Sequence, residues 1–261
     1  MSFSFGMITP HPPLIIERIG KENTAKLNKT QKAFEALEKY LSLNPIDTLI
    51  VISPHNKERG KFFDINFHHN YYADFSDFGD FTDNSEYKGN IRLVHLIQKI
   101  SDEETPVRMT HAENLDYGVS IPLELLLKKI KNISIVPLYT SDHSLADHFE
   151  LGKKLYEVIQ HTNQKIGIIA SADLSHKLTS DAPGGYSKKA TKFDQTIKKN
   201  IAEQNYNALL ELTPEELEDV GECGIKPIMI LAGIVSNMSH KTHVLCYEKP
   251  FGIGYMTVFY Q

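Results

Sequence analysis

Short runs of uninterrupted apolar residues constrain the fold of this chain more than any other feature of its sequence. Residues 48–52 form such a run, and residues 133–138, 166–170 and Phe3 to Ile8 are similar short, mostly apolar segments. A strand that is apolar on both sides is typical of a parallel sheet with helices packed on each face. We therefore expect these four segments to be strands of one largely parallel sheet.

Helical patterns alternate with these strands. Apolar residues recur at helical spacing over 24–41 and 145–160, and Ser144 with Asp147 is a possible capping box at the start of the second of these helices. Further helices are expected over 86–100, 119–130, 192–200 and 225–235, and another begins at Thr213-Pro-Glu-Glu216. This alternation predicts a layered α/β fold.

A single domain is expected over residues 1–261. The sequence has no internal repeat, no low-complexity tract and no linker-like change of composition that would divide it. Residues 62–67 alternate in polarity and predict one more strand. Two final strands, 242–247 and 254–259, are expected to close the sheet as an antiparallel hairpin.

Charge and cysteine content exclude several classes of partner. The formal net charge is -5 and no long run carries one sign, which argues against nucleic acid or an anionic membrane surface as a partner. Two cysteines are too few for a disulfide framework. Prolines interrupt the first apolar segment, and no stretch approaches the run of about 18 apolar residues that suggests a membrane span. A cytoplasmic protein is the expectation.

Polar residues directly follow three of the expected strands. His11 follows the first strand, His55 follows the second, and Asp173 and His176 follow the strand at 166–170. In open parallel sheets, ligands bind in the crevice at the carboxyl ends of the strands. Histidine is the commonest metal ligand and also titrates near neutral pH. The sequence therefore predicts a metal or acid–base site at this edge.

Glu222 is a candidate carboxylate for that site. It lies in Val220-Gly-Glu-Cys-Gly224, just before an apolar helix. It could stabilise the helix N-terminus by its charge, or it could complete the two-histidine, one-carboxylate arrangement of non-haem Fe(II) oxygenases. Cys223 beside it is expected to be a small buried residue, with a role as a competing soft ligand as the alternative.

Six short motifs, in order along the chain, carry a family resemblance. They are Pro10-His-Pro-Pro13, Ser53-Pro-His55, Leu115-Asp-Tyr-Gly118 with Pro122-Leu123, Ala170-Ser-Ala-Asp-Leu-Ser-His176, Gly221-Glu-Cys-Gly224 and Pro250-Phe-Gly-Ile-Gly254. With these motifs, the chain resembles the class III extradiol ring-cleavage dioxygenases, the LigB-like family, and is similar to a branch found beside Memo-type proteins. The resemblance implies Fe(II) held by His11, His55 and Glu222. It also implies His176 as the acid–base residue, and Asp173 as a residue that orients the loop or binds a ligand.

Tyr117 departs from the family pattern, which commonly has histidine at this position in Leu-Asp-His-Gly. A tyrosine donates a hydrogen bond, but its usual pKa of about 10 makes it a poor base at neutral pH. Standard extradiol chemistry in this chain therefore depends on what Tyr117 does in place of that histidine.

Three functions follow as hypotheses. The first is an Fe(II)-dependent dioxygenase that opens a small catechol-like aromatic ring with dioxygen. The second is a non-redox enzyme on the same scaffold that uses Zn²⁺ to activate water or a carbonyl. The third is a Memo-like metal-binding partner or regulatory module without catalysis. A homodimer is expected because symmetric dimers are the commonest oligomers.

Overall fold

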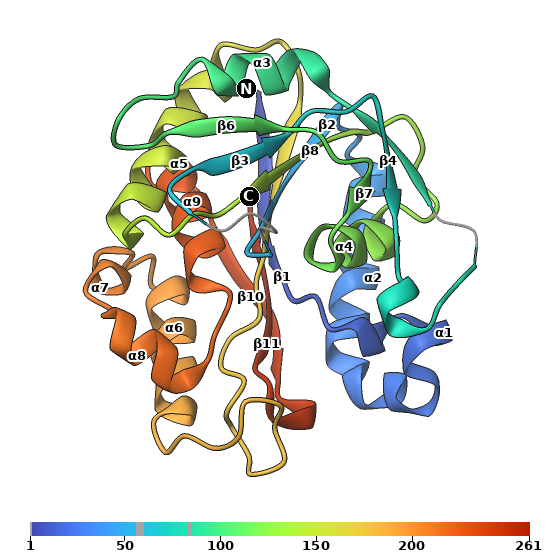
Figure 1. Cartoon of the computed structure of the whole chain (residues 1–261), viewed down its shortest axis with the longest axis vertical. Helices are drawn as coiled ribbons and strands as arrows, with labels where there is room; N and C mark the ends of the chain where they lie inside the picture. The colour runs from blue at the N-terminus through green and yellow to red at the C-terminus, as the bar shows by residue number, and fades with distance from the viewer. Residues whose placement is uncertain (1, 56–59, 83–84) are drawn as a thin grey trace.

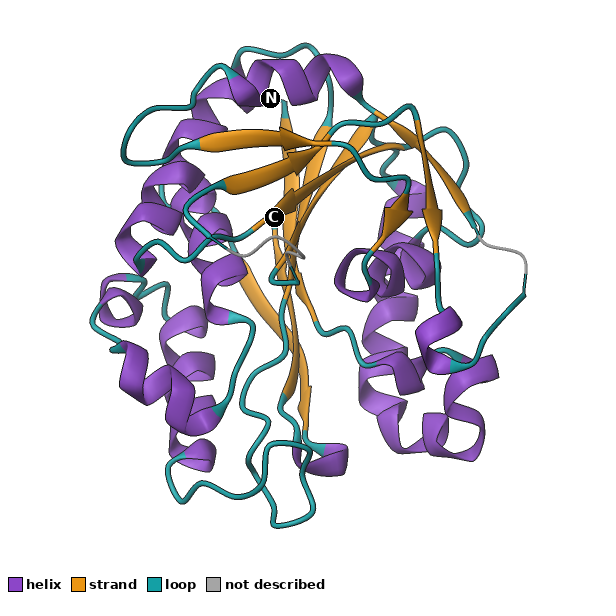
Figure 2. Cartoon of the chain, viewed as in Figure 1, coloured by secondary structure: helices purple, strands orange, loops and turns teal. Residues whose placement is uncertain are grey.

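A large sheet runs through the middle of the molecule, with helices on both sides (Figures 1 and 2). The computed structural model describes residues 2–55, 60–82 and 85–261. At its centre, neighbouring strands are parallel: β1 (Phe3–Thr9), β9 (Ile166–Ser171), β2 (Thr48–Ser53) and β8 (Ser134–Tyr139) lie in that order. The four apolar segments are therefore strands, and the largely parallel sheet is confirmed.

The sheet extends on both sides of this parallel centre. On one side, β11 (Tyr255–Tyr260) pairs with β1 and β10 (Thr242–Glu248) pairs with β11, both antiparallel, as the predicted closing hairpin requires. On the other side, β8 continues into β5 (Glu86–Gly89), β4 (Asn70–Ala73) and β7 (Asn114–Leu115). A branch of β3 (Phe63–Asn66) and β6 (Val107–Thr110) also leaves β8.

One expected helix is wrong in its first part. Residues Glu86–Gly89 form β5, and Lys88 and Gly89 pair in parallel with β8. Helix α3 (Ile91–Gln98) begins only after Asn90, whose side chain accepts a hydrogen bond from the backbone N–H of Leu93. Backbone groups that can pair with a neighbouring strand do so in spite of a helical side-chain pattern, because buried N–H and C=O groups need partners.

Helices cover both faces of the sheet. The helical segments are η1 (Pro13–Ile15), α1 (Glu17–Gly20), η2 (Lys21–Leu27), α2 (Asn28–Leu43), η3 (Ser76–Phe78), α3, α4 (Tyr117–Leu126), α5 (Leu145–Gln160), α6 (Ala190–Ala202), α7 (Asn207–Leu210), α8 (Pro214–Val220), α9 (Ile225–Val235) and η4 (Pro250–Gly252). Leu49 and Val51 of β2 face the core under α2 and α4, whereas Ile50 and Ile52 face the core under α5 and α9. Burial on both faces explains why the run is apolar without interruption.

The two capping motifs that the sequence indicates at helix starts are confirmed. Ser144 and Asp147 form both hydrogen bonds of a capping box at the start of α5. Thr213 and Glu216 do the same at the start of α8. Helix α9 has the expected bounds, whereas α2 starts at Asn28, after a 3-10 segment, rather than at residue 24.

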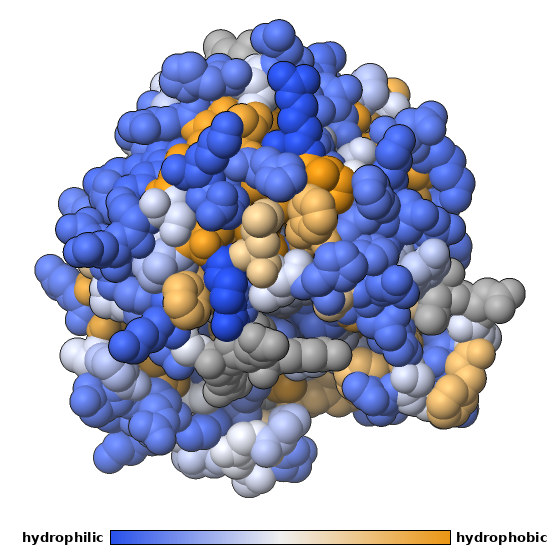
Figure 3. Space-filling model, turned by 45° about the horizontal axis from the view of Figure 1, so that its top comes forward, coloured by the Kyte–Doolittle hydropathy of each residue, from blue (hydrophilic) through white to orange (hydrophobic). Residues whose placement is uncertain are grey.

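Figure 3 shows a mostly hydrophilic face with apolar atoms gathered near its middle. Exposed apolar side chains at the β3–β6 branch include Phe62 and Met109. The Arg108 guanidinium lies over the Phe62 ring and pairs with the buried Asp64 carboxylate. Among the residues that the structure describes, no helix combines the length and apolar character needed to cross a membrane.

Candidate metal centre

His11 and His55 meet at the carboxyl ends of β1 and β2. Their Nε2 atoms are 3.0 Å apart, and the two rings are nearly perpendicular, at 81°. His11 is buried, and His55 is partly buried. The two nitrogens face each other at hydrogen-bond distance, which brings both within reach of a single ion.

A serine fixes the proton of His11. The Ser171 hydroxyl at the end of β9 donates to the carbonyl of Gly118, so its oxygen accepts from the Nδ1–H of His11, 2.8 Å away. The Nε2 lone pair of His11 then points at the centre, in the form that binds a metal. Burial lowers the pKa of His11 to about 3, with His176 nearby adding to the effect, so the ring is neutral at pH 7.

Cys223 supplies the third donor near these histidines. Its Sγ lies 3.6 Å from His11 Nε2, and His11, His55 and Cys223 form one group with ligand atoms within 4.8 Å of one another. Gly224 lets this loop approach the end of β9, because a Cβ there would lie 2.7 Å from the carbonyl oxygen of Asp173. Burial raises the pKa of the Cys223 thiol well above its ordinary value.

Glu222 points elsewhere in this structure. One of its carboxylate oxygens accepts from the backbone N–H of Ile225, 2.7 Å away, at the start of α9. Its burial raises the pKa of Glu222 to about 7. It also lines a cavity of about 180 Å³ with Cys223 and Lys226. Within the described residues, Glu222 belongs to neither potential metal-binding group, so its role as a ligand stays a prediction.

Asp173 lies against His11, and His176 lies near Cys223. Asp173 accepts from the backbone N–H of His11 at 2.9 Å, and its second oxygen lies 3.7 Å from His11 Nε2. His176 Nε2 is 3.9 Å from the Cys223 sulfur. Burial raises the pKa of Asp173 to about 6 and lowers the pKa of His176. Asp173, His176 and Cys223 form a second group of potential metal ligands.

Tyr117 covers the His55 side of the centre. It is the first residue of α4, after Asp116, which caps that helix. The Tyr117 hydroxyl lies 3.4 Å from His55 Nδ1, and the two ring centroids are 4.3 Å apart. Burial raises the pKa of Tyr117 above its ordinary value, so it is a neutral phenol at pH 7.

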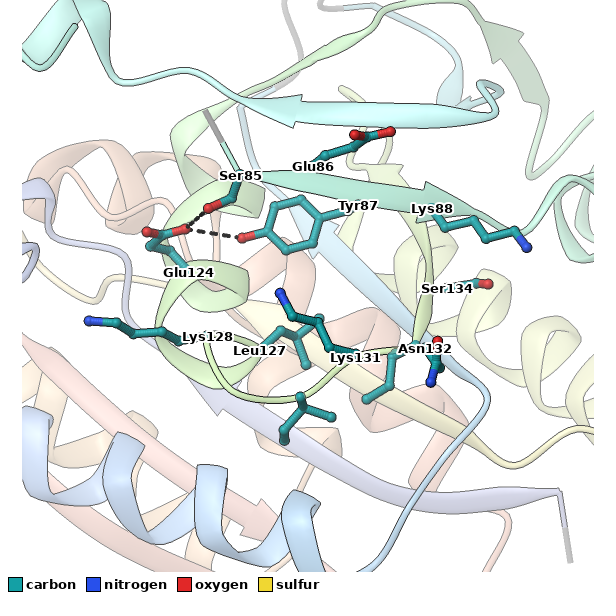
Figure 4. Close-up of a pocket in the computed structure, with 12 residues that line it drawn as sticks. Ser85, Glu86, Tyr87, Lys88, Glu124, Leu127, Lys128, Lys131, Asn132 and Ser134 are labelled. Carbon is teal, nitrogen blue, oxygen red and sulfur yellow. Dashed lines mark hydrogen bonds between the residues drawn. The ribbon is translucent and has the colours of Figure 1, made fainter. Parts of the chain in front are cut away.

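A separate cavity of about 400 Å³ lies beside β5 and α4, away from these residues (Figure 4). Glu124 in it accepts hydrogen bonds from the hydroxyl groups of Ser85 and Tyr87. The amino groups of its three lysines, Lys88, Lys128 and Lys131, point in different directions in Figure 4. They do not converge on one ligand, so we assign no function to this cavity.

The donor set fits a borderline or soft transition metal. Imidazole suits iron, copper and zinc, and thiolate favours the softer ions among them. The sequence placed His11, His55 and His176 at this edge and treated Cys223 first as a small buried residue, with a role as a soft ligand as the alternative. Its position beside Glu222, which the family resemblance implies as a ligand, was the signal for that alternative.

Comparison with known proteins places the chain in a family. A family described as the catalytic LigB subunit of aromatic ring-opening dioxygenase matches residues 6–259. The chain belongs to the LigB family. The fold is shared with the uncharacterized Escherichia coli K12 protein JW3007, whose crystal structure superposes with a TM-score of 0.65 at 18% identity, covering 98% of each chain.

Curated relatives of this LigB chain fall into more than one group. Protein CA_C1420 of Clostridium acetobutylicum is 27% identical over 98% of this chain, which spans only 57% of that protein's length. A MEMO1 family protein of Sulfolobus acidocaldarius is 24% identical, covering 81% of this chain and 71% of the relative. A 3,4-dihydroxyphenylacetate 2,3-dioxygenase of Escherichia coli is 26% identical, covering 57% of this chain and 58% of the relative.

Proposed function

We propose that this protein is an Fe(II)-dependent extradiol dioxygenase that opens a catechol-like ring. The observation that carries the proposal is the pair of opposed Nε2 atoms of His11 and His55, 3.0 Å apart at the carboxyl edge of a LigB fold. Cys223 is the third ligand in this proposal, in place of the Glu222 that the family resemblance implies. The name of the E. coli relative, 3,4-dihydroxyphenylacetate 2,3-dioxygenase, supports an aromatic diol as the substrate class.

Residues around the proposed ion have distinct roles. When bound, Fe(II) would acidify a substrate hydroxyl and bring substrate and dioxygen together. His176, whose pKa is lowered by burial, is neutral at pH 7 and can accept the substrate proton at Nε2. Asp173 holds the backbone of His11 in place. The phenol of Tyr117 can donate a hydrogen bond. Because its raised pKa keeps it protonated at pH 7, it cannot act as the base.

The test combines metal content with oxygen uptake. Protein purified without oxygen should retain iron through desalting, and His55→Ala and Cys223→Ala should retain less. Glu222→Gln is the matched variant that should keep wild-type iron content. Iron lost in Glu222→Gln but kept in Cys223→Ala would assign the third ligand to Glu222 instead. No iron dependent on His55 would overturn the proposal.

Oxygen-uptake assays with catechols then separate binding from catalysis. His176→Ala should keep the iron held by His11, His55 and Cys223 and lose turnover, because it removes the proton acceptor and not a ligand of that ion. Unchanged turnover would exclude His176 as the base. Turnover supported by Zn²⁺ under anaerobic conditions would instead favour the non-redox enzyme.

The second candidate is a metal-binding module without ring cleavage. The thiol of Cys223 beside the two histidines, and Tyr117 at a position where the family commonly has histidine, both favour it over standard extradiol chemistry. The MEMO1 family relative adds support. Iron that depends on His55, with no oxygen uptake for any catechol tested, would select this candidate.

A further inference from the structure

Cys223 belongs to two sets of potential metal ligands. In the first set, its sulfur is 3.6 Å from His11 Nε2, with His55 next to that nitrogen. In the second set, it is 3.9 Å from His176 Nε2, and Asp173, which also lies 3.7 Å from His11 Nε2, completes the set. In each set the ligand atoms lie within 4.8 Å of one another, and the sets share only Cys223.

One sulfur–nitrogen pair in each set is close to the dimensions of a site for one ion. Zinc–sulfur and zinc–nitrogen bonds of about 2.3 and 2.0–2.1 Å place neighbouring tetrahedral donors about 3.3–3.6 Å apart. The His11–Cys223 separation of 3.6 Å fits these dimensions directly. The Cys223–His176 separation of 3.9 Å fits after a shift of a few tenths of an ångström.

We propose that the centre binds two transition-metal ions bridged by the Cys223 sulfur. The first ion is held by His11 and His55, as in the proposed function on which this inference rests, and the second by Asp173 and His176. On loading, the Cys223 thiol releases its proton to solvent and becomes the shared thiolate. Both ions are of the class that accepts imidazole and thiolate together, such as Fe(II), Co(II) or Zn(II).

Charge and geometry both support the second position. Asp173 gives the second ion an anionic donor of its own, which lowers the cost of burying a second divalent cation. Asp173 also accepts a hydrogen bond from the backbone N–H of His11, which holds the two sets at a fixed separation.

A second ion would occupy His176 and prevent it from accepting a substrate proton. The two-ion form should therefore turn over more slowly than the one-ion form.

The experiment counts ions per chain with Co²⁺ as the probe. Metal-free protein is titrated anaerobically and desalted, and bound cobalt is measured by mass spectrometry of the metal. Wild type should retain two Co²⁺ per chain. His176→Ala and Asp173→Asn should each retain one, since both leave His11, His55 and Cys223 intact. His55→Ala should also retain one ion, held by Asp173, His176 and Cys223.

A surface control excludes binding elsewhere. His68 lies 3.3 Å from Glu113 and beside His111, so it is a histidine-rich site outside the centre. His68→Ala should still retain two ions. Paramagnetic resonance gives an independent readout, because two Co²⁺ ions that share a thiolate are magnetically coupled and lose signal per ion as the second site fills.

The outcomes separate this inference from the proposed function. Two ions in wild type, falling to one in His176→Ala, support both. One ion in wild type, unchanged in His176→Ala and lost in His55→Ala, overturns the bridged pair and leaves the proposed function standing. No tightly bound ion in wild type overturns both.

Discussion

The two histidines that face each other differ in what holds their second ring nitrogen. Ser171 keeps the proton of His11 on Nδ1, so the 3.0 Å contact between the Nε2 atoms requires His55 to donate from Nε2. His55 Nδ1 then accepts from the Tyr117 hydroxyl. A metal at both Nε2 atoms would require the His55 proton to move to Nδ1, where the Tyr117 oxygen can accept it. Tyr117 suits either state because a hydroxyl both donates and accepts.

Tyr117→Phe should therefore weaken metal binding without unfolding the protein. Loss of a hydrogen-bond partner behind a metal ligand commonly costs about tenfold or more in affinity. The measurement is the dissociation constant for Co²⁺ in an anaerobic titration. Tyr186→Phe, at a side chain that is 66% exposed, is the control and should bind as wild type does. Equal affinity in both variants would exclude a role for the Tyr117 hydroxyl.

A buried histidine outside the centre should make the protein sensitive to acid. His148 is fully buried, its Nδ1–H donates to the Ser144 carbonyl, and burial lowers the pKa of His148 to about 3. The unfolded chain binds a proton at this residue below about pH 6.5 and the folded chain does not. The free energy of unfolding should therefore fall as the pH falls from about 6.5 toward 3.

His148→Gln should reduce that dependence. Each such histidine contributes up to about 1.4 kcal/mol per pH unit within this window, and His11 contributes in the same direction. Urea denaturation of metal-free protein at pH 4.5, 5.5 and 6.5 would measure the slope for wild type and variant. Equal slopes in wild type and His148→Gln would contradict a lowered pKa for His148. His161→Gln, at an exposed position, is the control.

Helices α5 and α9 approach each other through two glycines. A Cβ on Gly152 would lie 2.1 Å from the carbonyl oxygen of Ile230, and one on Gly233 would lie 2.0 Å from that of Phe149. These contacts are with backbone atoms, which cannot rotate away. The pair lets α9 pack closely against α5, and the loop that carries Cys223 leads directly into α9.

Gly152→Ala should destabilise the protein despite the better helix propensity of alanine. Replacing glycine by alanine within a helix gains about 1 kcal/mol of helix propensity. Overpacking of a tight interface costs about 1–3 kcal/mol. Because the clash at Gly152 is with backbone atoms, we expect a cost near the upper end of that range. We expect a net loss of about 2 kcal/mol by chemical denaturation. Glu157→Ala, at an exposed position of α5, should change stability little. A more stable Gly152→Ala would show that the helices can separate freely.

At the scale of the whole molecule, the proposed ligands come from distant parts of the chain. His11 follows β1, His55 follows β2, and Cys223 lies between α8 and α9. An ion that joins them binds the folded state and not the unfolded chain, so it stabilises the fold. Free metal at 100 times the dissociation constant should add about 2.7 kcal/mol per site.

Thermal unfolding with and without Co²⁺ measures this stabilisation. The midpoint should rise in wild type and rise less in His55→Ala and Cys223→Ala. An equal rise in all three would mean that the metal acts elsewhere. A homodimer stays a prediction, which light scattering of the purified protein would test.

The sequence by itself determined the strands of the parallel centre, most helix starts and the edge where the site lies. These follow from general rules: apolar runs mark strands buried on two faces, capping residues mark helix starts, and ligands bind at the carboxyl ends of parallel strands, where His11, His55 and His176 follow. The sequence did not predict β5, because pairing with β8 depends on a neighbour far along the chain. Through the family resemblance it favoured Glu222 over Cys223 as a metal ligand, and that choice stays a prediction. Only the packing of the loop before α9 against the end of β9 turns the thiol toward His11 and the carboxylate toward Ile225, because side-chain direction in a loop is set by its tertiary contacts.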